Sequence, residues 1–175
     1  MRNTAFLLLG IALILIQSNL FRLVGLVHVA GITPSLILPL IVFMGVHEYS
    51  LGRGALLSFV LGYLVDVFVA APVGLYTFNS VAIFVVSRVA GVRLAAQTML
   101  TKMGLAFAFS LLEGTLVIIL TAIFGKDPSR PRALASLVLP HAAATALIAP
   151  FVFRVAQRVH EATVSVPHPE KVTGR

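Results

Sequence analysis

The stretch Gly62-Tyr-Leu-Val-Asp66, followed closely by Pro72-Val-Gly74-Leu75, places a carboxylate inside an otherwise apolar segment and directly before a charge-free turn. An ionisable group within a lipid bilayer costs at least a few kcal/mol, so it persists where it faces protein or a wet cavity. Asp66 therefore predicts that its segment is one helix of a membrane bundle, with its inner face turned toward other helices.

The composition supports a membrane protein. Of the 175 residues, 59% are hydrophobic and only 11% are charged, and the mean hydropathy is +1.03. Soluble domains carry roughly 25% charged residues. The net charge of +7 is more simply explained by Lys and Arg at helix ends than by nucleic-acid binding. The absence of cysteine excludes disulfides and thiolate metal sites.

Six apolar segments, separated by charges and by proline and glycine, are predicted to be membrane-spanning helices. They are Thr4–Val24, Pro34–His47, Gly54–Ala71, Gly74–Gly91, Thr98–Phe124 and Leu134–Gln157. The first is interpreted as a retained helix because no small-residue cleavage site follows it. The second is short and holds Pro34 and Pro39, so a re-entrant segment is an alternative there.

The positive charges favour a topology with both termini in the cytoplasm. With the N-terminus inside, nine Lys and Arg residues fall on the cytoplasmic side and four on the other. Residues 1–158 are predicted to form one transmembrane bundle, and residues 159–175, with Pro167 and Pro169, a polar cytoplasmic tail. The predicted location is the cytoplasmic (inner) membrane of a bacterium.

Four polar side chains within the predicted spans are candidates for an intramembrane polar cluster: Asp66, Asn79, Glu113 and His141. In the six-span topology they lie from the middle of the bilayer outward. They are expected either to converge on one outer-leaflet cavity or, as the favoured alternative, to be satisfied separately by neighbouring helices.

A second pattern lies on the third segment, where Gly54, Ser58, Gly62 and Asp66 follow one another at intervals of four residues. Residues four apart share a helix face, and small residues let another helix approach closely. Packing within the bundle is the favoured interpretation of this helix-docking face, and a partner protein's helix is the alternative. The Pro72, Gly74 and Leu75 motif is expected to shape the turn between the third and fourth segments.

No pattern in the chain indicates catalysis. The sequence has no HExxH, no glycine-rich phosphate loop and no Cys/His metal spacing. We therefore expect a non-enzymatic protein without cofactor or metal.

With Gly62-x-x-x-Asp66 and Pro72-x-Gly74-Leu75, the chain resembles the rod shape-determining protein MreD family. Pro34-Ser35 at the start of the second segment and Arg53-Gly54 before the third fit the same family. The resemblance implies a subunit of the bacterial cell-elongation complex that supports peptidoglycan synthesis. Its implied partners are MreC, through a transmembrane helix, the glycan polymerase RodA with a class B penicillin-binding protein, and, indirectly, MreB filaments.

This family is also similar in fold to the substrate-binding subunits of energy-coupling-factor vitamin transporters, which makes such a subunit the alternative function. Many of those subunits carry an Ala-x-x-x-Ala pattern on the first helix. Here the small residues Ala5, Gly10 and Ala12 include no pair four apart, and the chain contains no tryptophan for a vitamin site.

Overall fold

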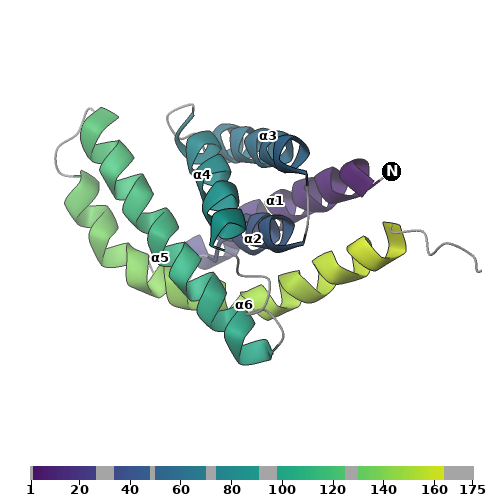
Figure 1. The fold of residues 1–175 in the computed structure, drawn as a ribbon. Helices are drawn as coiled ribbons and strands as arrows, with labels where there is room; N and C mark the ends of the chain where they lie inside the picture. The colour runs from purple at the N-terminus through teal and green to yellow at the C-terminus, as the bar shows by residue number, and fades with distance from the viewer. Residues whose placement is uncertain are drawn as a thin grey trace, which may run out of the picture.

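The structure, a computed structural model, describes residues 2–26, 34–47, 50–69, 74–90, 98–124 and 130–163. Over these ranges the regular structure is entirely helical (Figure 1). The helices are α1 (Arg2–Leu26), α2 (Ile37–Val46), α3 (Leu51–Val69), α4 (Leu75–Val89), α5 (Met99–Phe124) and α6 (Arg130–Thr163). Each one falls on a segment predicted from the apolar runs, so the all-helical fold class is confirmed.

Three helices are long and apolar enough to cross a membrane: Leu51–Val69, Met99–Phe124 and Leu134–Thr163. The apolar helices Asn3–Asn19, Ile37–Val46 and Leu75–Val89 are shorter. At 1.5 Å per residue, the ten residues of α2 extend about 15 Å, half of the roughly 30 Å hydrocarbon core. A crossing at α2 would therefore need the residues on either side of the helix, and the six-span topology stays a prediction.

Helix α2 lies at the centre of the molecule, and all ten of its residues are buried. It packs against α4, α6, α5, α1 and α3, which surround it (Figure 1). A helix that is apolar all round is either buried among other elements or faces lipid, and α2 is buried. Its side chains, including Leu40, Val42 and Met44, form the middle of the hydrophobic core.

Two side chains from neighbouring helices satisfy the backbone at the start of α2. Ser35 N donates a 3.0 Å hydrogen bond to Thr145 Oγ1 on α6, and Leu36 N donates a 2.9 Å hydrogen bond to Gln17 Oε1 on α1. The first amides of a helix have no partner within that helix, and in an apolar interior each must find one elsewhere. These bonds fix the start of α2 between α1 and α6.

Helices α5 and α6 lie side by side, and the remaining four helices gather next to them (Figure 1). Helix α6 contains Pro140 and Pro150 and changes direction along its length, so that its later turns extend beneath α2 and α1. Proline removes a backbone hydrogen bond and bends a helix. The bend lets one helix pack against α5 with its first half and against α1 and α2 with its second.

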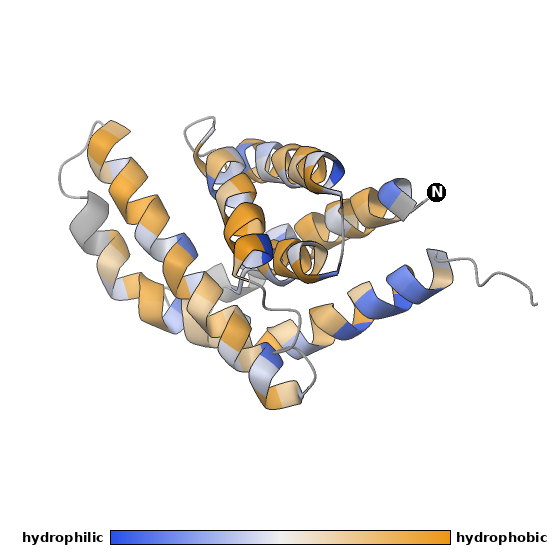
Figure 2. Cartoon of the chain, in the orientation of Figure 1, coloured by the Kyte–Doolittle hydropathy of each residue, from blue (hydrophilic) through white to orange (hydrophobic). Residues whose placement is uncertain are grey.

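Hydrophobic residues predominate along much of the helical structure (Figure 2). Large apolar side chains are exposed on every helix except α2. Leu8, Phe59, Phe78, Ile123 and Leu147 are examples, and Leu147 is 70% exposed. Exposed apolar side chains on five helices suit contact with lipid. Polar residues gather instead on the last turns of α6, which extend the helix to Thr163 and into the beginning of the predicted polar tail. Residues 164–175 lie outside the described ranges.

Candidate functional site

Asp66, near the end of α3, caps the first turn of α4. Its Oδ2 accepts hydrogen bonds from Gly74 N at 2.9 Å, from Thr77 N at 3.1 Å and from Thr77 Oγ1 at 2.6 Å, and its Oδ1 accepts one from Tyr76 N at 2.7 Å. The side chain is 1% exposed. A carboxylate at a helix N-terminus meets both unpaired amides and the positive end of the helix dipole. The charge of Asp66 is thus compensated by backbone and one hydroxyl.

Gly74, at the start of α4, explains why the cap comes from a side chain of α3. Gly74 occupies the N-cap position of α4 and has no side chain that could cap the helix, so the carboxylate of α3 takes that place. Its φ angle is +100°, a conformation that favours glycine. Leu75 then begins α4. Pro72, the remaining residue of the turn motif, lies outside the described residues.

The predicted helix-docking face packs against α4 of the same chain. A Cβ atom on Gly62 would lie 2.7 Å from both Thr77 Cα and Tyr76 O, and one on Gly54 would collide with the ring of Phe84. Ser58 is fully buried, as is nearly all of Asp66. The structure therefore shows the small face in internal packing, the interpretation favoured from the sequence. A partner's helix would have to bind to another surface, because α4 already occupies this one.

A cavity of about 250 Å³ lies where all six helices meet. Its apolar wall comes mainly from α2, α5 and α6, with Val65, Val69 and Ile83 added from α3 and α4. The polar side chains that line it are Gln17, Ser35, Tyr76, Ser80, Glu113 and His141. An apolar cavity with a few polar groups is the usual form of a small-molecule site.

The four residues of the predicted polar cluster do not lie together in the structure. Glu113 and His141 line the same cavity, from α5 and α6. Asp66 is not part of the cavity wall, and its described hydrogen bonds go to the first turn of α4. Asn79 is 1% exposed, lies outside the cavity wall, and has an Oδ1 atom without a hydrogen-bond partner among the described residues.

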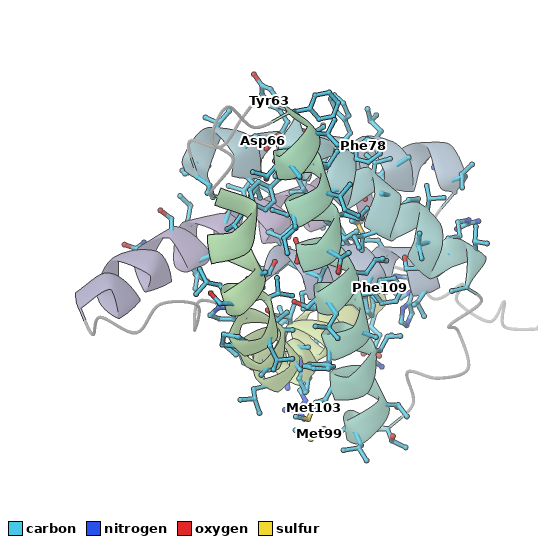
Figure 3. All side chains as sticks on the ribbon, turned by 90° about the vertical axis from the view of Figure 1, so that its left-hand side faces the viewer. Tyr63, Asp66, Phe78, Met99, Met103 and Phe109 are labelled. Atoms are coloured by element: carbon cyan, nitrogen blue, oxygen red, sulfur yellow. The ribbon has the colours of Figure 1, made fainter. Side chains whose placement is uncertain are left out.

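Figure 3 labels Asp66 near Tyr63 and Phe78 at one end of the molecule, whereas Met99 and Met103, in the first turns of α5, lie at the opposite end. Helix α5 runs between these ends, with Phe109 about halfway. The capped α3–α4 turn is thus at the end toward which α5 runs. In the predicted topology this is the outer side of the membrane.

Sequence reasoning missed several polar residues that position or line the cavity, among them Gln17, Tyr76, Ser80 and Thr145. Gln17 and Thr145 hold the start of α2, and Thr145 Oγ1 also donates to His141 O at 2.8 Å. Tyr76 lines the cavity one residue after the turn motif. Gln17 carried a usable signal, because an amide within an apolar helix needs a partner, just as a carboxylate does. The hydroxyl of Thr145 carried none, because threonine readily bonds within its own helix.

Within the described ranges, no group of three or more His, Asp or Glu side chains is arranged to hold a metal ion. Comparisons with known proteins add no relative: no family model, no curated protein and no solved structure matches the chain.

Proposed function

We propose that this chain is a non-enzymatic subunit of the bacterial cell-elongation complex, located in the cytoplasmic membrane with both termini inside. In this role it binds MreC and supports peptidoglycan synthesis by RodA and a class B penicillin-binding protein. The proposal rests on the residues that resemble the MreD family, Gly62-x-x-x-Asp66 and Pro72-x-Gly74-Leu75.

The observation that carries the proposal is the capped α3–α4 hairpin. Gly62 permits close approach, Asp66 caps α4, and Gly74 supplies the positive φ angle. Gly62, Asp66 and Gly74 thus act together where α3 packs against the first turn of α4, and this gives a physical reason for a family to share them. The packed pair of α3 and α4 would offer a partner its surface and needs no chemistry of its own.

Partner binding would use the outer apolar surface. The small face of α3 is occupied by α4, whereas α3, α4 and α5 expose Phe59, Phe78 and Ile123. Transmembrane helices associate through close packing rather than through a hydrophobic driving force, so the contact would depend on shape.

The test is purification of the tagged chain from native membranes in mild detergent, with the bound proteins identified by mass spectrometry. Co-purification of MreC together with cell-wall synthases is the expected result. A tagged, unrelated polytopic protein from the same membranes is the control for non-specific capture. Recovery of neither MreC nor a synthase above that control would overturn the proposal.

The central cavity favours the second candidate, a solute-binding subunit of an energy-coupling-factor transporter. The same purification distinguishes the two, because such a subunit would bring down paired ATPases and a transmembrane coupling protein. The cavity residues Glu113 and His141 would then belong to the solute site.

A further inference from the structure

The wall of the central cavity holds one acidic side chain, Glu113, and one histidine, His141. Glu113 is the one Asp, Glu, Lys or Arg residue among the described residues that line it. Most of the remaining wall is aliphatic, including Ile41, Val117 and Leu137. A carboxylate in such surroundings loses water contacts and gains most from a partner that donates hydrogen bonds or carries positive charge.

Among the described residues, one oxygen of Glu113 has no such partner. Its Oε2 is buried and accepts no hydrogen bond from any residue that the structure describes. Two other polar side chains of the wall have partners: Gln17 Oε1 accepts from Leu36 N, and Ser35 Oγ accepts from Leu38 N at 3.3 Å. Buried polar atoms are nearly always paired in folded proteins, so an unpaired acceptor at a cavity wall points to a group that comes from outside.

The size and shape of the space restrict that group. About 250 Å³ exceeds the roughly 150 Å³ that accommodates a benzene-sized ligand. A second cavity of about 260 Å³ shares Gln17, Val65 and Val69 with the first. Phe68 and Val69 on its wall are about half exposed, so the second cavity reaches the outer surface of the bundle. The two spaces together suit an elongated molecule with an apolar body.

We infer that the cavity binds a small amphiphile with a protonated amine, which donates hydrogen bonds to Glu113 while its apolar chain extends along Val65 and Val69. An amine is favoured over an acid because the wall offers a carboxylate. It is favoured over a neutral alcohol because charge-assisted hydrogen bonds are the stronger kind. This inference is independent of the proposed function, since a scaffold subunit or a solute-binding subunit could hold such a ligand.

The test measures binding of isotopically labelled octylamine to the purified chain in phosphatidylcholine nanodiscs by equilibrium dialysis, with empty nanodiscs as background. 1-Octanol and octanoate have the same chain length and differ in the head group. We expect saturable binding of octylamine, with at least about tenfold weaker binding of the other two. Failure of octylamine to bind above background, or equal binding of all three compounds, would overturn the inference.

Three variants locate the site. Glu113→Gln keeps the shape of the side chain and removes the acidic group that pairs with an amine, and should weaken octylamine binding at least about tenfold. Val117→Phe, one helical turn along on α5, should block the cavity and abolish binding. Glu161→Gln removes an exposed carboxylate outside the cavity and should leave binding unchanged. Folding of each variant is checked by elution profile and helicity. Wild-type affinity in folded Glu113→Gln would contradict the role assigned to the carboxylate.

Discussion

Thr77 Oγ1, in the first turn of α4, donates a 2.6 Å hydrogen bond to Asp66 Oδ2, near the end of α3. The backbone amide of Thr77 donates to the same oxygen at 3.1 Å. Two helices are thus joined by a carboxylate that serves as the cap of the second. The capping side chain lies outside the helix it caps, because the N-cap residue is glycine.

Replacing Asp66 tests this cap. Asp66→Leu leaves the buried amides at the start of α4 without an acceptor and should lower the free energy of unfolding by about 3 kcal/mol or more. Asp66→Asn retains one acceptor oxygen and should cost clearly less. Thermal unfolding in detergent, followed by circular dichroism, measures both. Glu161→Gln, an exposed carboxylate on α6, is the control and should change stability by less than about 0.5 kcal/mol. Equal losses for the Leu and Asn variants would contradict the cap.

Two glycines of α3 form a matched pair for testing close approach. A Cβ on Gly62 would press on the backbone of α4, whereas one on Gly52 would meet no described residue within 4 Å beyond its own helical turn. Gly62→Ala should therefore cost about 1–3 kcal/mol through overpacking. Gly52→Ala should be neutral or stabilising by up to about 1 kcal/mol, because alanine favours the helix. Unfolding in detergent compares the two, and similar stabilities would show that the helices do not approach as closely as described.

Substitution of Gly74 tests how the backbone conformation alone affects stability. Apart from its chain neighbours, no described residue lies within 4 Å of a Cβ built there, so Gly74→Ala meets no steric contact among the described residues. Its φ of +100° still makes any L side chain unfavourable, and we expect a loss of about 1–2 kcal/mol. Gly104→Ala on α5 also enters open space, but without a positive φ, and should be stabilising. A stabilising Gly74→Ala variant would mean that the turn adopts another conformation.

Substitutions of Thr145 and Thr115 compare a hydrogen bond between two segments of the bundle with a hydrogen bond within one helix. Thr145→Val leaves the buried Ser35 N–H without its acceptor and should cost about 1–3 kcal/mol. Thr115 is exposed and donates to Leu111 O of its own helix, so Thr115→Val should change stability by less than about 0.5 kcal/mol. Chemical unfolding with a denaturing detergent gives the difference. Equal losses of stability in the two variants would show that Thr145 does not stabilise the start of α2.

The positions of the helices could be predicted from the sequence because apolar runs and their interruptions are local properties. Pro34 and Gly74 precede α2 and α4 as expected, and the long apolar run before Phe124 is α5. The central position of α2 could not be predicted. Its shortness and its uniformly apolar sequence fit a thin lipid-facing segment as well as a buried one, and only the packing of the other helices around it decides between them.

The candidate site was predictable in part. The cost of a carboxylate in an apolar segment identified Asp66 and Glu113 as residues that need partners, but not which partners. Asp66 finds its partners within eleven residues of the chain, whereas Glu113 faces a cavity assembled from all six helices. The first arrangement depends on one turn, and the second on long-range packing that no local pattern records.

The dependence of Asp66 on α4 has a consequence for how the chain is made. If α3 entered the bilayer alone, it would carry a carboxylate with no amide donors, at a cost of a few kcal/mol. We therefore expect the translocon to release α3 and α4 as a pair rather than one after the other. Glycosylation mapping of fusions in microsomes measures this: α3 alone should insert poorly, α3 with Asp66→Leu should insert well, and addition of α4 should restore insertion of the natural sequence.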